Sequence, residues 1–415
     1  MIGAIALAHG DDPGLRSLLR PYQVKTLEAI AACGTAAMGF HEDACDACGD
    51  RRLVPNTCGN RSCPHCQGRV RAEWVEDRTD ELLPVGYFHV VMTLAPELRA
   101  LAKVFPRVVL GAMMRAAPEV IASLCRDDKH LGGEVGQLAV LHTWRRDLGW
   151  HPHVHLIVTA GGWDASRKRW LPAHRHGPAQ TPFLLPVALL RAAFQRRMRT
   201  LLLKAYREDA FAIDGPTTFP ELTSLDAFTA RLNVSIARPW VVRIEPPFGG
   251  PVQVLKYLGA YVGRVAITPK RILAHDLEAE TVTYTWRTNA EPDKPQHATI
   301  PAVEFLQRFA QHILPPRFQR IRFVGLWSTA HRESKLRHVQ RHLATRPQPS
   351  TTPPAPPPTP TPSPPGTTCT CCGLGHYQRR PGPSPRPSST ERRRLLAAMR
   401  QGLRTNTPSQ ATTTA

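Results

Sequence analysis

The sequence lacks the features that define several large classes of protein. It has no run of eighteen apolar residues, which a membrane-spanning helix would need. Its first residues, MIGAIALAHGDDPG, have no basic segment ahead of a long apolar stretch and are not typical of a secretory signal peptide. No Gly-Lys-Ser or Gly-Lys-Thr sequence occurs, so the chain has no P-loop. We therefore expect a cytoplasmic protein that has no membrane partner.

Acidic residues are scarce relative to basic ones. The 415 residues include 53 Lys and Arg against 33 Asp and Glu, a formal net charge of +20, and only nine of the cations are lysine. The excess of basic residues is not confined to the C-terminal region, because residues 1–345 hold 44 cations and 32 acidic side chains. Neutralised phosphates release counterions, so this charge favours a polyanion such as DNA as partner. The preference for arginine fits forked phosphate contacts or, equally, the base composition of the genome.

Composition divides the chain into three regions. Residues 1–80 hold six of the ten cysteines, residues 81–345 alternate helical and strand patterns, and residues 346–415 begin with a Pro, Thr and Ser tract. The hydrophobic content of 42% suffices for a core, whereas the proline-rich tract cannot bury one. We predict a small domain over residues 1–80, an α+β domain over residues 81–345 and a disordered, basic tail over residues 346–415.

The cysteines of the first region are spaced as in a zinc site. In HEDACDACGDRRLVPNTCGNRSCPHCQ, two Cys-x-x-Cys pairs are separated by fourteen residues, and each pair can bring two thiolates to one Zn²⁺ ion. A disulfide framework is the alternative, which the reducing compartment expected for this chain disfavours. The predicted zinc ligands, which make residues 1–80 a zinc-binding domain, are Cys45, Cys48, Cys63 and Cys66.

Other potential ligands lie near these pairs and rank below them. The residues that could replace a ligand or build a second site are Cys33, Cys58, His41 and His65. Arg61, beside the second pair, could contact a DNA phosphate, although a purely structural zinc site is an equal alternative. Cys369 and Cys372 in the tail supply only half of a tetrahedral site, so we interpret them as an incomplete one.

Three histidines stand just before an apolar run in LGWHPHVHLIVTAGG, residues 148–162. In a strand, residues two apart point to the same face, so His153 and His155 project together while Val154 points to the other side. Two adjacent imidazoles can hold one metal ion. The alternative is a set of structural histidines with ordinary hydrogen bonds.

A third imidazole comes from the preceding segment, QLAVLHTW, which also alternates. The two segments predict an antiparallel hairpin, and a register that pairs Trp144 with His151 places His142 opposite His153, with Cβ atoms ~5 Å apart. A slip of one residue would turn His142 to the other face. His151 is a weaker candidate, because Pro152 disturbs strand pairing. The predicted metal ligands are therefore His142, His153 and His155.

A pair of tyrosines follows about a hundred residues later, in FGGPVQVLKYLGAYVGRVAI. Pro251 suits the first turn of a helix and Gly263 its end. Tyr257 and Tyr261 are four residues apart, so they lie side by side on one face of this helix. Taken alone, the pattern favours an amphipathic helix with two half-buried tyrosines over a catalytic pair.

These motifs together resemble a known family. From about Leu19 to His342 the chain is similar to the two-tyrosine rolling-circle transposases of the insertion-sequence-ninety-one type, in the superfamily with a His-hydrophobic-His motif. The motifs that carry the resemblance occur in this order: CDACG, NRSCPHCQ, FHVVMTLAPEL, LHTWRRDLGWHPHVHLIVTAGG, PPFGGPVQVLKYLGAYVGRVAI and VEFLQRFAQHILPPRFQRIRFVGLW.

The resemblance implies a fold and an activity. It implies an antiparallel sheet whose central strands carry the histidines, with helices packed on one side and a zinc-binding domain in front. It makes Tyr257 and Tyr261 the nucleophiles and His153 and His155 ligands of a catalytic ion. It also implies DNA, single-stranded at the element ends, as the substrate, because a phosphate in a stable duplex is hard to bend into such a site.

The implied reaction has clear chemical requirements. A tyrosine hydroxyl has an ordinary pKa of about 10 and is a weak nucleophile at neutral pH, so the phosphodiester must be activated. A divalent ion can polarise a phosphate oxygen, and Mn²⁺ or Mg²⁺ is the expected catalytic cofactor beside structural Zn²⁺. Attack leaves a 5′-phosphotyrosine that keeps the bond energy for rejoining, which agrees with the missing P-loop.

Two other functions remain open from the sequence. A zinc-dependent DNA-binding protein without catalysis explains the charge and the cysteines but not the histidines or tyrosines. A plasmid replication initiator or relaxase would use the same chemistry. The oligomeric state is not specified by any of these patterns.

Overall fold

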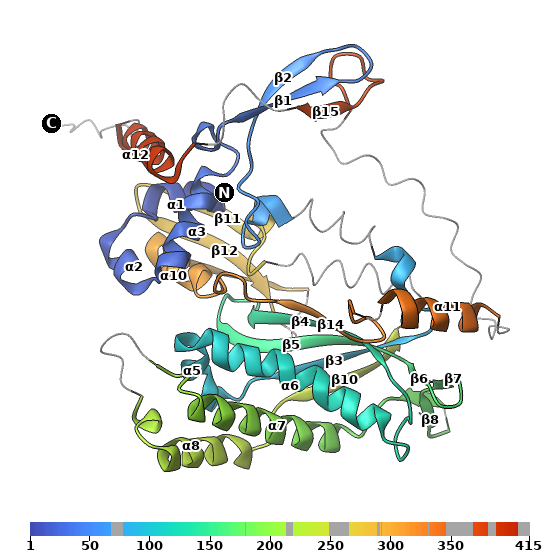
Figure 1. Cartoon of the computed structure of the whole chain (residues 1–415). Helices are drawn as coiled ribbons and strands as arrows, with labels where there is room; N and C mark the ends of the chain where they lie inside the picture. The colour runs from blue at the N-terminus through green and yellow to red at the C-terminus, as the bar shows by residue number, and fades with distance from the viewer. Residues whose placement is uncertain are drawn as a thin grey trace.

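The structure is a computed structural model that describes residues 1–67, 78–178, 180–212, 219–248, 265–288, 291, 293–330, 332–345, 368–380 and 387–405. At its centre is an antiparallel sheet in the strand order β10-β3-β5-β4-β14 (Figure 1). Its strands, from one edge to the other, are β10 (Val242–Phe248), β3 (Tyr87–Thr93), β5 (Trp150–Thr159), β4 (Gly136–Trp144) and β14 (Ile321–Gly325). The prediction of an α+β fold built on an antiparallel sheet is confirmed.

Helices cover one face of this sheet (Figure 1). They are α5 (Arg99–Val104), α6 (Pro106–Arg126), α7 (Val187–Arg207) and α8 (Leu225–Ala237). Alternate residues of β5, Val154, Leu156 and Val158, are fully buried beneath these helices. By length and composition α6 could cross a membrane, but its apolar residues are packed in the core beneath the sheet. It is thus a core helix of this domain.

The other face of the sheet has two parts. At one end, Leu138, Val140 and Ile157 pack in a cluster with Trp327 and with Val339 of α11 (Arg337–Ala344). The predicted histidines lie further along the same face, since His153 and His155 have the strand parity of Ile157. Short hairpins flank the sheet: β6 (Gly161–Asp164) with β7 (Arg169–Pro172), and β8 (His174–His176) with β9 (Thr181–Phe183).

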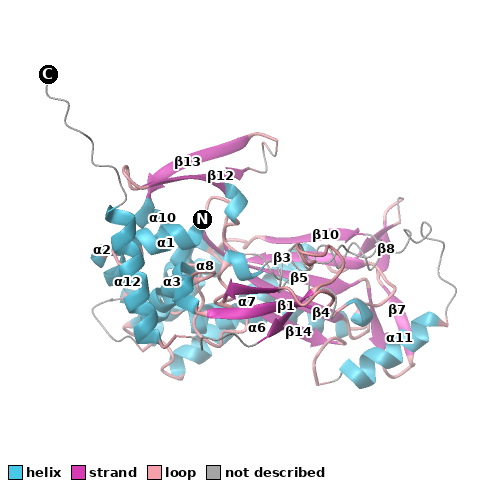
Figure 2. Ribbon diagram, turned by 90° about the horizontal axis from the view of Figure 1, so that it is seen from above, coloured by secondary structure: helices cyan, strands magenta, loops and turns pink. Residues whose placement is uncertain are grey.

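A second core joins segments from both ends of the chain. Its elements are α1 (Ile2–His9), α2 (Pro13–Leu18), α3 (Pro21–Ala32), β11 (Ile272–Asp276), β12 (Thr281–Arg287), β13 (Pro295–Pro301), α10 (Ala302–Ala310) and α12 (Ser389–Thr405). Ile5, Leu27, Phe305 and Leu396 are each at most 1% exposed and belong to one hydrophobic cluster. Figure 2 shows α12 beside α1 and α3, although nearly the whole sequence separates them.

The C-terminal region also contributes a strand. β15 (Tyr377–Arg380) pairs with β1 (Phe40–Cys45), which pairs in turn with β2 (Arg51–Pro55), so the three form a small antiparallel sheet (Figure 1). The expectation of a disordered tail over residues 346–415 therefore does not hold for β15 or α12. Composition missed them because the neighbouring proline-rich tract dominates the region, while these two segments gain their stability from residues far away in sequence.

The docking of α12 gives a first prediction. Leu396 is 1% exposed in the second core, whereas its neighbour Leu395 is 37% exposed. Leu396→Asp would bury an unpaired charge and should lower the free energy of unfolding by about 2 kcal/mol or more, unless the helix detaches instead. Hydrogen exchange of residues 389–405 should then accelerate strongly, whereas Leu395→Asp should leave it near wild type. Equal exchange in the two variants would contradict this docking.

Candidate metal centres

Strand pairing brings three histidines together on the central sheet. His142 of β4 lies directly opposite His153 of β5, as the sequence predicts. One nitrogen from each of His142, His153 and His155 lies within 4.8 Å of the others. The predicted pairing of Trp144 with His151 is wrong: the register shifts after His142, and Trp144 pairs with Trp150. This irregularity does not affect the histidine cluster, because it comes after His142.

The two imidazoles of β5 are oriented by hydrogen bonds at their Nδ1 atoms. The Nδ1 atom of His153 lies 2.7 Å from the backbone oxygen of His151. Since a carbonyl oxygen only accepts, Nδ1 carries the proton, and Nε2 is the nitrogen that can coordinate a metal ion. His151 itself stands outside the cluster and contributes through its backbone.

A second histidine and a carboxylate orient His155. The Nδ1 atom of His155 lies 2.8 Å from Nε2 of His89 on β3, and Nδ1 of His89 lies 2.8 Å from Oε2 of Glu245 on β10. The carboxylate accepts from His89, so neutral His89 accepts in turn from His155, and Nε2 of His155 is the nitrogen that can coordinate a metal ion. Burial lowers the pKa of His89, which favours this neutral form. His89 and Glu245 are not among the residues predicted from the sequence, although His89 lies in the motif FHVVMTLAPEL.

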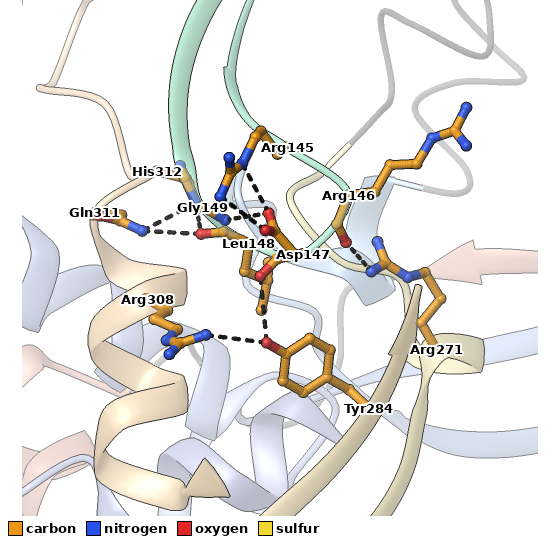
Figure 3. Close-up of polar contacts among 10 residues, drawn as sticks. All are labelled: Arg145, Arg146, Asp147, Leu148, Gly149, Arg271, Tyr284, Arg308, Gln311 and His312. Atoms are coloured by element: carbon orange, nitrogen blue, oxygen red, sulfur yellow. Dashed lines mark hydrogen bonds and ion pairs between the residues drawn. The ribbon is translucent and has the colours of Figure 1, made fainter. Parts of the chain in front are cut away.

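Side chains of the second core hold the turn between β4 and β5, the two strands that carry the histidines (Figure 3). Leu148 is fully buried with φ of 65°, a left-handed conformation that is uncommon for leucine. Its carbonyl oxygen accepts hydrogen bonds at 3.0 Å from Nε2 of Gln311 and from Nε2 of His312. The hydroxyl of Tyr284 on β12 donates to the carbonyl oxygen of Asp147 at 3.3 Å. These contacts stabilise a strained turn between the two histidine-bearing strands.

His312 is held neutral in this position. Its Nε2 atom donates to the Leu148 carbonyl, and its Nδ1 atom lies 3.1 Å from the Thr143 hydroxyl. Burial lowers the pKa of His312 to about 4, and the hydrogen bond to Leu148 only partly opposes this effect. The charged groups that act on it are Lys103, which lowers the pKa further, and Asp147, which raises it.

The cysteines form two clusters rather than one. Cys33, Cys58, Cys63 and Cys66 make the first, which we call the N-terminal cluster. Cys45, Cys48, Cys369 and Cys372 make the second, which we call the tail cluster. The four predicted ligands are thus divided between two sites, and the residues ranked below them complete each site. Cys-x-x-Cys spacing predicts which two cysteines share an ion, but it does not identify the other pair.

The N-terminal cluster has the dimensions of a four-thiolate zinc site. Its Sγ–Sγ distances include 3.6 Å from Cys66 to Cys33 and to Cys58, and 3.7 Å from Cys33 to Cys63. A tetrahedral site with Zn–S bonds of ~2.3 Å has sulfur atoms about 3.8 Å apart. Hydrogen bonds with Cys33 and Cys58 lower the pKa of Cys63, and hydrogen bonds with Cys33 and Cys63 raise the pKa of Cys58. Cys58 and Cys63 therefore do not ionise together in the absence of a cation.

Neighbouring candidates have other roles. Arg61 donates to the backbone oxygens of Leu314 and Pro315 at 3.1 Å and 2.6 Å, so its guanidinium ties this region to the segment after α10. His41 is hydrogen-bonded to Asn56 at 3.1 Å and stands outside both cysteine clusters. The predicted nucleophiles Tyr257 and Tyr261 lie outside the described residues, as does the helix predicted around them.

Comparison with known proteins gives two family matches. Residues 136–335 match the family described as "Putative transposase", and residues 6–94 match the "Transposase zinc-binding domain". A "Putative transposase y4qJ" of Sinorhizobium fredii is 39% identical over 331 residues, covering 80% of this chain and 81% of that protein. The "Transposase for insertion sequence element IS801" of Pseudomonas savastanoi pv. phaseolicola is 28% identical over 328 residues, covering 74% and 70%. No solved structure matches the chain significantly.

The sheet with its histidine cluster and the cysteine clusters define a metal-binding α+β protein, and the matches specify its class as transposases. The chain belongs to the transposase family of the insertion-sequence-ninety-one type, with that family's zinc-binding domain near its N-terminus. The family resemblance drawn from the motifs is confirmed. Transposases act on DNA, which agrees with the formal net charge of +20.

The state of His312 gives a prediction for acid pH. Its folded pKa of about 4 lies below the ordinary value of 6.5, so the unfolded chain binds the proton more readily. The contribution of neutral His312 to the free energy of unfolding is fully present above about pH 6.5. It is lost as the pH falls towards 4, and the loss is about 3 kcal/mol at most. His312→Gln should therefore flatten the pH dependence of the unfolding free energy over this range.

The exposed His174 provides the control for this measurement. His174→Gln removes an imidazole that stands in the solvent-facing strand β8, so denaturant titrations of this variant should follow the wild-type pH profile. A wild-type profile for His312→Gln as well would show that His312 does not carry this dependence.

Proposed function

We propose that this transposase nicks and rejoins single-stranded DNA through a 5′-phosphotyrosine and moves an insertion sequence by a rolling-circle route. The observation that supports the proposal best is the histidine cluster, in which strand pairing brings three imidazoles together and hydrogen bonds orient two of them, His153 and His155. Simple structural histidines would not need this shared orientation. The proposed setting is cytoplasmic, where the element's DNA is located.

The cluster fits a divalent cation. His142, His153 and His155 would hold it, and His89 with Glu245 would fix the orientation of His155. When bound, Mn²⁺ or Mg²⁺ would polarise the scissile phosphate. Three nitrogen ligands favour Mn²⁺, while cellular abundance favours Mg²⁺.

Cations next to the cluster suit a phosphate backbone. Burial lowers the pKa of His151 to about 4, and the nearby charges of Arg99 and Arg145 contribute to the decrease. Arg243 is exposed on β10 and has the strand parity of Glu245, so it belongs to the histidine-bearing face of the sheet. A DNA strand placed across this face would meet positive potential on both sides of the cluster.

The proposed reaction balances without a co-reactant. The phenol oxygen of Tyr257 or Tyr261 forms a bond to phosphorus while the bond to the 3′ oxygen breaks; the phenol loses a proton and the departing oxygen gains one. The phosphotyrosine keeps the phosphoester, so a later 3′ hydroxyl can reverse the step on another strand. With two tyrosines, one would hold the donor end while the other engages a second strand.

A covalent-capture assay tests this function. Labelled single-stranded DNA carrying the element ends, incubated with Mn²⁺ or Mg²⁺, should give a protein–DNA band on a denaturing gel. His153→Ala or His155→Ala should decrease this band by roughly 100-fold or more, with DNA affinity nearly unchanged because the basic surface remains. His174→Ala, at an exposed position of β8, should retain full adduct formation.

The tyrosines are tested in the same assay. Tyr257→Phe and Tyr261→Phe should each retain a covalent adduct at the other position, and only the double variant should lose it entirely. Mass spectrometry of the adducts identifies the linked residue. A phosphotyrosine found at one position alone would leave a single nucleophile, and the absence of any adduct would reject the transfer chemistry and favour a non-catalytic DNA-binding protein.

The positioning role of Glu245 is tested by metal binding rather than by activity. Glu245→Ala should weaken Mn²⁺ binding by about tenfold or more in calorimetric titrations of zinc-loaded protein, because His155 loses its orientation. Glu245→Gln should be intermediate, since the amide oxygen still accepts from His89. Glu208→Ala is the control for loss of charge, because it removes an exposed carboxylate just after α7 and should leave Mn²⁺ binding unchanged. Unchanged Mn²⁺ affinity in Glu245→Ala would exclude this role.

A further inference from the structure

The tail cluster joins two Cys-x-x-Cys pairs from opposite ends of the chain. The Sγ atoms of Cys45 and Cys372 are 3.8 Å apart, and those of Cys48 and Cys369 are 3.7 Å apart. Both distances fit the separation of about 3.8 Å in a tetrahedral four-thiolate zinc site. All ten cysteines lie in the described part of the chain and none of them forms a disulfide, since these separations are far longer than the ~2 Å of an S–S bond.

The two pairs have the same local structure. Each is followed by a glycine with positive φ, 75° at Gly49 and 67° at Gly373. Both glycine amides donate to the carbonyl oxygen of the first cysteine of their own pair, at 3.2 Å and 2.9 Å. The shared CxxCG sequence thus builds one turn twice, and the two turns face each other with their sulfur atoms together.

Backbone amides point at the sulfur atoms in both turns. The Sγ atom of Cys45 accepts from the amide of Ala47 at 3.4 Å, and the Sγ atom of Cys369 accepts from the amide of Cys371 at 3.3 Å. The Sγ atom of Cys372 accepts from the amide of Gly375 at 3.4 Å. Such donors stabilise negative charge on sulfur, which is the form that binds a metal ion.

Around this cluster the tail packs closely against the strands β1 and β2. Cys45 pairs with Tyr377 in the β1–β15 ladder, and the Tyr377 hydroxyl donates to Asp50 at 2.7 Å. The guanidinium of Arg52 lies 3.7 Å from the centre of the Tyr377 ring. At Gly375 an added Cβ would lie 2.5 Å from the Sγ atom of Cys45, so only glycine permits this approach.

We propose that Cys45, Cys48, Cys369 and Cys372 bind a second structural Zn²⁺ ion, which fastens the C-terminal tail to the N-terminal zinc-binding domain. This site is separate from the N-terminal cluster, whose ligands all come from residues 33–66. It is also independent of the strand-transfer chemistry proposed above, because it involves neither the histidine cluster nor the tyrosines.

Thiol alkylation of the full-length, zinc-loaded protein tests the site. Cys48 and Cys371 are both exposed, but only Cys48 belongs to the cluster. In the zinc-loaded protein, iodoacetamide should modify Cys371 rapidly and Cys48 at least tenfold more slowly. Removal of zinc with a chelator should then make Cys45, Cys48, Cys369 and Cys372 reactive together. Equal modification of Cys48 and Cys371 before chelation would overturn the proposal, as would protection of Cys369 and Cys372 that persists after the metal is removed.

Zinc content gives an independent measurement. Wild-type protein should contain two zinc ions per chain, and Cys369→Ser with Cys372→Ser should contain one. Cys371→Ser, which removes a neighbouring thiol outside the cluster, should retain both. Continued protection of Cys63 and Cys66 in the double variant shows that the N-terminal cluster is intact. Two zinc ions in that double variant would overturn the proposal. Neither experiment uses DNA, so its result does not depend on the proposed strand-transfer activity.

Discussion

The antiparallel pairing of β4 with β5 is the constraint on which the histidine cluster depends. It places His142 opposite His153, while the two-residue alternation along β5 adds His155 on the same face. The same alternation buries Val154 and Leu156 under the helices, so one strand provides both core and ligands. A shift of one residue would bury the imidazoles and expose the aliphatic chains, so the hydrophobic core also fixes the geometry of the histidine cluster.

The histidine cluster is supported on two sides by different parts of the molecule. On one side, β3 and β10 bring His89 and Glu245 next to His155. On the other side, the hairpin turn receives Gln311 and His312 from the second core, which also contains the N-terminal helices. The zinc-binding domain is therefore not an independent attachment. The second core, which contains its helices, also provides the side chains that stabilise the turn between the two histidine-bearing strands.

The sequence predicts this site only where the relevant contacts are local. His142 and His153 could be paired because a short hairpin links them and both segments alternate. His89 and Glu245 could not be found in this way, because they are more than sixty residues from His155 and their contact depends on the order of the strands. The division of the cysteines was missed for the same reason. A Cys-x-x-Cys pair determines its own turn, whereas its partner pair is chosen by the fold, in one case across 321 residues.

The return of the tail to the N-terminus involves two attachments that support each other. One is the tail cluster with β15, and the other is α12, whose Arg400 donates to the carbonyl oxygen of Leu7 at 2.7 Å. Closing so long a chain costs entropy, but the cost grows only logarithmically with length, by about 0.6 kcal/mol for each doubling. Once either segment has docked, the other is held at high effective concentration and needs little further ordering. A zinc ion in the tail cluster would thus stabilise the docking of α12 without touching it.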